Sequence, residues 1–140
     1  MAAISQERVN KAYAALGTLD EKIMDEYWDE NMVWLVPGHN PLSGWYHGRK
    51  AFINLMKTVG ELSGGSFHMS VITITTNEEY STDVTNNQGS RAGAPDVKLN
   101  IDVGHTLRWK NGKVIAGKGG IFGDGTDQYD HFWSYRVEKK

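Results

Sequence analysis

The first third of the chain carries apolar residues at helical spacing. Val9, Ala12, Tyr13 and Leu16 recur every three or four positions, as on one face of an α-helix. Ser5 is a suitable N-cap for this helix and Gly17 a suitable end. The sequence Thr18-Leu19-Asp20-Glu21 matches a capping box. It predicts a second helix whose apolar stripe is Ile23, Met24, Tyr27 and Trp28.

A short strand and a third helix are predicted next. Met32 to Val36 is an apolar, partly β-branched run closed by Pro37-Gly38, which is typical of a strand. The segment from His39 to Gly48 contains a proline and glycines, so we expect a loop there. Arg49 to Leu62 returns to helical spacing and is followed by Ser63-Gly64-Gly65, which predicts the end of that helix.

Beyond Gly65 the pattern changes to that of β-strands. Strands are predicted over Ser66–Thr76, Tyr80–Asn86, Val97–Trp109 and Val114–Phe122, with a hairpin turn at Asn111-Gly112 and a longer loop over Asn87–Pro95. In the third of these strands Leu99, Ile101, Val103, His105, Leu107 and Trp109 share one face, and Asn100, Asp102, Thr106 and Arg108 share the other. This strand is long, so we expect it to bend, with Gly104 as a bulge.

Helices followed by a run of antiparallel strands predict an α+β domain. We expect a cone-shaped, cystatin-like roll, in which three helices pack on the concave face of a curved antiparallel sheet. The 140 residues suit one domain spanning 1–140. A cone of this kind can enclose a ligand.

Composition narrows the function. The net charge of −2 gives no basic surface for nucleic acid or an anionic membrane. No apolar run is long enough to span a bilayer, and the first residues do not resemble a secretory signal, so we expect a cytoplasmic protein. The absence of cysteine excludes disulfides, zinc–thiolate sites and thiol nucleophiles. Neither a His-x-x-x-His pair nor a P-loop ending is present, so we expect no metal and no cofactor.

His105 is the main catalytic candidate. An imidazole among apolar neighbours on an inward face is partly desolvated, which favours the neutral form that can accept a proton. Such a group suits the general base of an enolisation, aldol cyclisation or dehydration. The alternative is a core histidine whose two nitrogens are both bonded to protein.

Further candidates would share the cavity with His105. Tyr13 lies on an apolar helix face and could donate to a carbonyl oxygen that gains charge, or it could be an ordinary core tyrosine. Asp127, in the C-terminal segment, could supply an acid/base group if that segment folds over the cone, although charges near a chain end are usually solvated. Asp83 is a reserve candidate. The predicted substrate-binding wall is apolar: Trp34, Phe52, Met56, Trp109 and Phe122.

The order of elements resembles the SnoaL-like branch of the nuclear transport factor 2-like superfamily, which includes ketosteroid isomerases and polyketide cyclases. The resemblance rests on Trp34–Gly38, Pro41–Gly44, Tyr46–Arg49, His105–Val114 and Asp127–Trp133, and it covers residues 9–134. It implies an oxyanion donor at Tyr13 and a second donor position at His105. The general-base aspartate of the isomerases matches Leu35, so that base is missing here.

Two functions remain open at this stage. The first is a cofactor-independent isomerase, cyclase or dehydratase acting on a small apolar carbonyl or polyketide-like molecule, with His105 as acid/base and Tyr13 as donor. The second is a non-catalytic ligand-binding or dimerisation module of the same fold. The resemblance also implies a homodimer that pairs through the polar face of the long strand.

Overall fold

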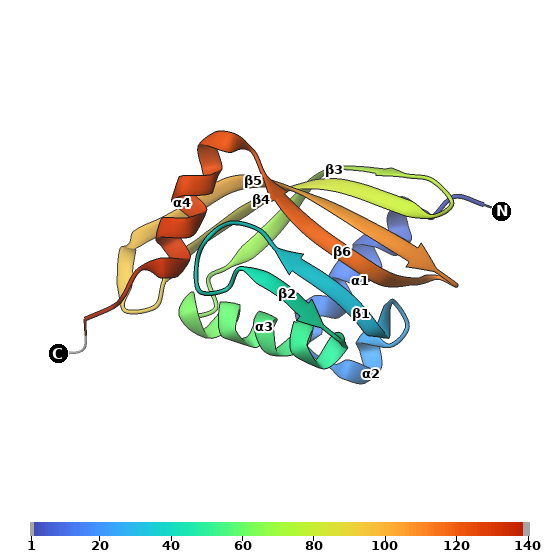
Figure 1. Cartoon of the computed structure of the whole chain (residues 1–140), viewed down its shortest axis with the longest axis horizontal. Coiled ribbons are helices and arrows are strands. Elements are labelled where there is room, and N and C mark those ends of the chain that lie inside the picture. The colour runs from blue at the N-terminus through green and yellow to red at the C-terminus, as the bar shows by residue number, and fades with distance from the viewer. Residues whose placement is uncertain (1, 139–140) are drawn as a thin grey trace.

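The computed structural model describes residues 2–138, which form six strands and four helices (Figure 1). The helices are α1 (Gln6–Thr18), α2 (Glu21–Met24), α3 (Arg49–Leu62) and α4 (Gly123–Ser134). The strands are β1 (Trp28–Val36), β2 (Gly44–His47), β3 (His68–Thr76), β4 (Tyr80–Arg91), β5 (Ala94–Lys110) and β6 (Lys113–Ile121). The expected α+β class is confirmed.

The strands make a curved sheet in the order β2-β1-β6-β5-β4-β3. Helices α1, α2 and α3 lie together on one side of it, and α4 crosses the opposite end of the molecule (Figure 1). All neighbouring strands are antiparallel except β1 and β6, which pair in parallel. The sheet is therefore mixed, and α4 is a fourth helix beyond the three that were expected.

The long strand β5 forms the centre of the core. Its alternation is confirmed: Leu99, Ile101, Val103, His105, Leu107 and Trp109 are buried. These side chains meet Trp28, Trp34 and Phe52 from β1 and α3. Strand alternation places every second residue on the helix-covered face, so the apolar residues of β5 and the apolar stripes of the helices are buried together.

Two element boundaries differ from the prediction. Helix α2 ends at Met24, and Trp28 begins β1, because the Trp28 indole is fully buried and donates from Nε1 to Ala12 O at 2.9 Å. The N-cap of α2 also differs from the one that the predicted capping box implies. Asp20, not Thr18, caps α2 by accepting from the backbone N–H groups of Lys22 and Ile23.

The β-region differs in three places. The predicted loop over residues 39–48 contains β2, which pairs with β1. The predicted loop over Asn87–Pro95 is mostly strand, with a turn at Ala92-Gly93. Gly104 pairs regularly with both neighbouring strands, and the irregularity of β5 against β6 lies between Arg108 and Trp109 instead.

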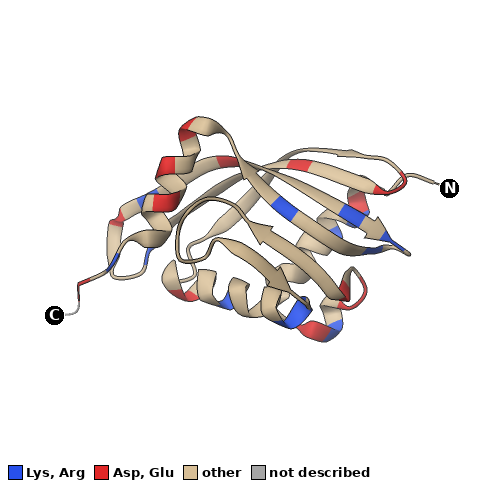
Figure 2. Ribbon diagram, in the orientation of Figure 1, with Lys and Arg blue, Asp and Glu red and all other residues tan. Residues whose placement is uncertain are grey.

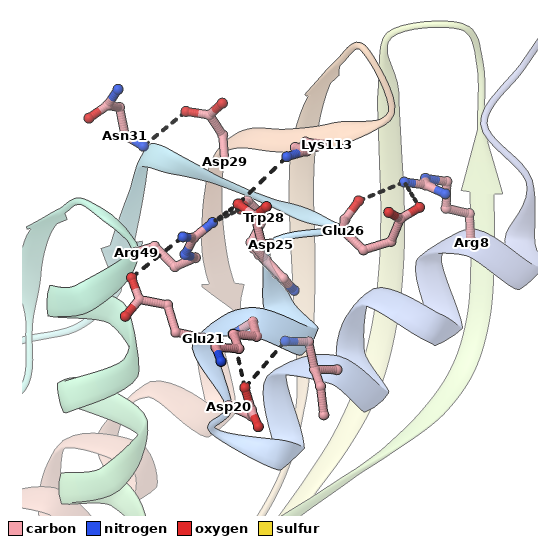
Figure 3. Close-up of polar contacts among 12 residues, drawn as sticks. Arg8, Asp20, Glu21, Asp25, Glu26, Trp28, Asp29, Asn31, Arg49 and Lys113 are labelled. Carbon is pink, nitrogen blue, oxygen red and sulfur yellow. Dashed lines mark hydrogen bonds and ion pairs between the residues drawn. The ribbon is translucent and has the colours of Figure 1, made fainter.

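Arg49 joins α3 to the α2 corner (Figure 3). Its Nη1 donates to Asp25 Oδ1 at 2.6 Å and to Trp28 O at 2.9 Å. This hydrogen bond, together with the charge of Lys113, holds the pKa of the Asp25 carboxyl below its usual value. The buried guanidinium thus fixes the chain where it turns from helix into β1.

Charged residues are dispersed over the molecule. In the view of Figure 2 both signs of charge are spread over the molecule, although α4 carries only acidic residues and β6 only basic ones. Among residues 2–138 no helix combines the length and the apolar character that crossing a bilayer requires.

Candidate functional site

The inward face of β4 is polar although it lies in the core. Ser81, Asp83, Thr85 and Asn87 alternate along it, and each is at most 4% exposed. A buried polar group is costly unless it is hydrogen-bonded. Where these side chains find their partners therefore shows how the site is built.

Asp83 joins the two residues singled out from the sequence. Its Oδ2 accepts from Tyr13 Oη at 2.5 Å, and its Oδ1 lies 2.9 Å from His105 Nδ1. Strand pairing sets this geometry, because Asp83 lies directly opposite His105 in the β4–β5 ladder. A carboxylate only accepts hydrogen bonds, so Nδ1 carries a hydrogen, and in the neutral imidazole Nε2 carries the lone pair.

Tyr13 has a different role from the one expected. Its hydroxyl hydrogen is donated to Asp83, so it is not free for a ligand oxygen, and the oxyanion-donor role does not fit this arrangement. Burial, followed by the charge of Asp83, raises the pKa of the phenol well above its usual value. Tyr13 thus stays neutral and holds one oxygen of Asp83 while His105 takes the other.

His105 lines an apolar cavity of about 70 Å³. Its ring lies 5.9 Å from that of Tyr13 and 5.7 Å from that of Trp34, centroid to centroid. Nε2 has no hydrogen-bond partner among the described residues and is not enclosed by other atoms. The lone pair therefore remains available to a molecule in the cavity.

Three of the five predicted wall residues line this cavity: Trp34, Phe52 and Met56. Trp34 and Phe52 stack with ring centroids 4.8 Å apart. Trp109 is buried elsewhere in the core and donates from Nε1 to Ser81 Oγ at 2.9 Å. Phe122 is 57% exposed at the start of α4. These two residues are therefore not placed in the wall.

Asp127 is not brought to His105 either. The C-terminal segment does fold over the cone, as helix α4, but Asp127 lies on its exposed face. The inward face carries Tyr129 and Trp133, which line the cavity. Asp130 fastens the helix by accepting from His39 N at 2.8 Å and from Asn40 Nδ2 at 2.9 Å.

Sequence reasoning missed Asn87, Tyr129 and Trp133 and left Asp83 as a reserve. Tyr129 and Trp133 are four residues apart, which was a usable helical signal. For β4 no such signal exists, because the inward residues Ser81, Asp83, Thr85 and Asn87 are all polar, whereas the only apolar residue among those between them is Val84. The sequence therefore does not indicate which face of β4 is buried.

Two further positions shape the cavity. A Cβ on Gly117 would lie 2.5 Å from the Trp34 ring, whereas Gly119 lines the cavity itself. The glycine-rich stretch of β6 therefore accommodates the Trp34 ring and leaves room beside His105.

Leu35 lies on the other side of β1 from the cavity-lining Trp34 and Val36. Within residues 2–138 no three His, Asp or Glu side chains are grouped to hold a metal ion.

These features define a cone-shaped α+β protein with a small apolar cavity and a buried Tyr–Asp–His arrangement. Its fold is that of the nuclear transport factor 2-like superfamily. No protein-family model matches the sequence, and no curated protein matches it.

Several solved structures are similar to this chain over most of its length. Bal32a, from a soil-derived mobile gene cassette, is 27% identical with a TM-score of 0.80, over 91% of this chain and 94% of that one. A nuclear transport factor 2-like protein from Burkholderia xenovorans is 20% identical with a TM-score of 0.73, over 89% and 93%. TerC, co-crystallised with polyporic acid, is 13% identical with a TM-score of 0.74, over 92% and 97%. Other similar structures have cystatin-like and ketosteroid isomerase-like folds.

Proposed function

We propose that this protein is a cofactor-independent enzyme of the SnoaL-like type that moves a proton on a small apolar carbonyl compound. The observation that carries the proposal is the free Nε2 of His105 at the wall of an apolar cavity, with Nδ1 held by the buried Asp83. Isomerisation, aldol cyclisation and dehydration all need such a base.

The proton moves from a substrate carbon to His105 Nε2. The electron pair of the broken C–H bond enters the adjacent carbonyl group, and the imidazolium later returns the proton to carbon or to a leaving hydroxyl. Asp83 fixes the tautomer and stabilises the imidazolium, as a carboxylate does in other histidine-based sites. Tyr13 keeps Asp83 oriented by donating to its second oxygen.

Deuterium exchange tests the proposal without knowledge of the natural substrate. A panel of cyclic ketones and lactones is incubated with the protein in D₂O, and exchange at the carbon beside the carbonyl is followed by NMR. We expect the protein to accelerate exchange for at least one compound. His105→Ala should lower that rate by about 100-fold or more, the usual contribution of a general base.

Two further variants make the result specific. Asp83→Asn should also lower the rate, because an amide can donate to Nδ1 and favour the tautomer that leaves Nε2 protonated. His47→Ala removes an exposed imidazole on β2 and should leave the rate unchanged. Equal exchange by the wild type and His105→Ala, or no exchange with any compound, would overturn the enzyme proposal.

A non-catalytic ligand-binding module is the second candidate. The position of the base in the isomerases is occupied by Leu35, which points away from the cavity-lining side of β1. Under this alternative a compound of the panel binds in the cavity and shifts the NMR signal of His105 while no deuterium is incorporated.

We also propose that the protein forms a homodimer through the outer face of the sheet. Trp45 and Tyr80 are 58% and 41% exposed there. They share a shallow depression with Thr106, Arg108, Ala116, Gly117 and Lys118. Large exposed aromatic side chains on a broad sheet face are typical of an association surface.

A further inference from the structure

Asn87 carries a second free polar group in the cavity. The residue is 4% exposed and lines the cavity wall. Its Oδ1 accepts from Thr85 Oγ1 at 2.8 Å, which fixes the amide and turns Nδ2 away from Thr85. Within the described part of the chain Nδ2 has no hydrogen-bond partner, and it is not sealed off by other atoms.

The other buried polar side chains of β4 are all paired within the protein. Ser81 accepts from Trp109, Asp83 accepts from Tyr13 and His105, and Thr85 donates to Asn87. Asn87 Nδ2 is not a buried orphan atom, because it remains accessible beside the cavity, where a molecule can accept a hydrogen bond from it. A free donor on a strand whose other polar groups are satisfied is therefore best explained by a ligand that supplies the acceptor.

We infer that Asn87 Nδ2 binds an acceptor oxygen of the substrate, at the end of the cavity away from His105. Asn87 lies four positions beyond Asp83 on β4, about 13 Å along the strand at roughly 3.3 Å per residue. Both side chains reach inward from the same face, so a ligand between them has its two polar ends several ångströms apart. This inference rests on the proposed function and extends it to the substrate.

The two free groups have opposite hydrogen-bonding character. His105 Nε2 accepts a hydrogen, and Asn87 Nδ2 donates one. The matching substrate is a compact conjugated carbonyl compound, with its acidic hydrogen at one end and its carbonyl oxygen at the other. When His105 removes the proton, the electron pair moves through the conjugated system to that oxygen. Asn87 then stabilises the charge where it accumulates, the role of an oxyanion-hole donor.

The neighbouring surface sets the shape of the ligand. A cavity of about 70 Å³ is smaller than the roughly 150 Å³ that holds a benzene ring. A groove of about 320 Å³ adjoins it and shares Tyr13, Leu16, Met56, Phe67 and Met69 with it. Methionine side chains rearrange readily, so Met56 and Met69 can admit a ring part of which extends into the groove.

Two phenols that differ in one oxygen test the inference. The ligand 4-hydroxyacetophenone offers a hydroxyl to His105 and a carbonyl oxygen to Asn87, whereas 4-ethylphenol lacks the carbonyl oxygen. Binding is measured by calorimetry at a pH below the pKa of both phenols. We expect the wild type to bind the ketone more tightly. Asn87→Leu should weaken ketone binding by about tenfold and leave 4-ethylphenol binding nearly unchanged.

The variants are matched to separate binding from folding. Asn87→Leu leaves the Thr85 hydroxyl without its acceptor. The double variant Thr85→Val, Asn87→Leu removes both groups and should lose the preference for the ketone over 4-ethylphenol to the same extent. Asn86→Leu alters the adjacent residue on the opposite face of β4 and should keep the preference for the ketone. If Asn87→Leu does not fold, Thr85→Val alone should reduce the preference by freeing the amide to rotate.

The inference is overturned if the wild type shows no preference for the ketone, including the case in which it binds neither phenol. It is also overturned if Asn87→Leu weakens both ligands equally. Deuterium exchange reports separately on the proposed function. Exchange without a preference for the ketone removes only the role of Asn87, whereas a preference without exchange keeps Asn87 as a binding residue and removes the enzyme.

Discussion

A single buried carboxylate determines the local structure of the site. Asp83 is fully buried, and an ionised carboxylate in the core would cost several kcal/mol without compensation. Tyr13 and His105 supply that compensation from two other elements, α1 and β5. The three residues therefore depend on one another. A change at any of them alters the orientation of the imidazole as well as the stability.

Tyr13→Phe tests this dependence through pH. The folded protein holds the Tyr13 proton more tightly than the unfolded chain, because the pKa of the buried phenol is raised. The stabilisation is therefore complete below about pH 10 and is lost as the pH rises above it. At pH 7 the variant should be less stable by about 1–3 kcal/mol. The gap to the wild type should narrow above pH 10 in urea unfolding followed by fluorescence.

Tyr27→Phe serves as the control for this experiment. It keeps the aromatic ring, which lies 4.7 Å from the guanidinium carbon of Arg8, and should remain close to the wild type at pH 7. A difference between Tyr13→Phe and the wild type that stays constant up to the alkaline limit would show that the hydroxyl is not coupled to Asp83 as described.

Periodicity in the sequence predicted some elements well and others poorly. Helix α3 has the predicted bounds, and the inward face of β5 is as predicted, because each has a clear apolar pattern. The β4–β5 register could not be predicted in the same way. The register shifts between Ser90 and Arg91. If the register of the pair Arg91–Ala94 continued along β4, Asp83 would lie opposite Asp102 instead of His105. This irregularity in the ladder places Asp83 opposite His105, and no local sequence pattern predicts it.

Gly117 in β6 offers a prediction about packing. A Cβ there would lie 2.5 Å from Trp34 Cζ3 and 2.8 Å from Leu107 Cδ2. Gly117→Ala must therefore displace the Trp34 ring, which stacks on Phe52 in the cavity wall. Overpacking of this kind typically costs about 1–3 kcal/mol. Thermal unfolding should show the loss, and the affinity for any cavity ligand should fall with it.

Gly120→Ala is the matched control in the same strand. The nearest atom to a Cβ at this position is Gly104 O, 3.9 Å away, so the substitution should be neutral or slightly stabilising. If the two alanine variants have equal melting temperatures, the Trp34 ring is not packed against Gly117.

At the scale of the whole molecule the sheet separates two surfaces with different roles. Its inner side holds the cavity and the Tyr13–Asp83–His105 arrangement, and its outer side carries exposed side chains from β2, β4, β5 and β6. The sequence indicated both surfaces through the alternation in β5. The spacing of Tyr129 and Trp133 signals the helix α4, but it does not indicate that this helix covers the cavity, because that placement depends on contacts with segments distant in the sequence.

The proposed homodimer is tested on that outer side. Light scattering at micromolar concentration should give twice the 15.7 kDa of one chain. Trp45→Glu places a charge on the proposed interface and should give the monomer mass with an unchanged circular dichroism spectrum. Ile23→Glu replaces a residue of similar exposure on α2 and should remain a dimer. A wild-type mass of one chain would contradict the proposal. The cavity would be unaffected by that result, since its lining comes from the inner face of the sheet and the helices of a single chain.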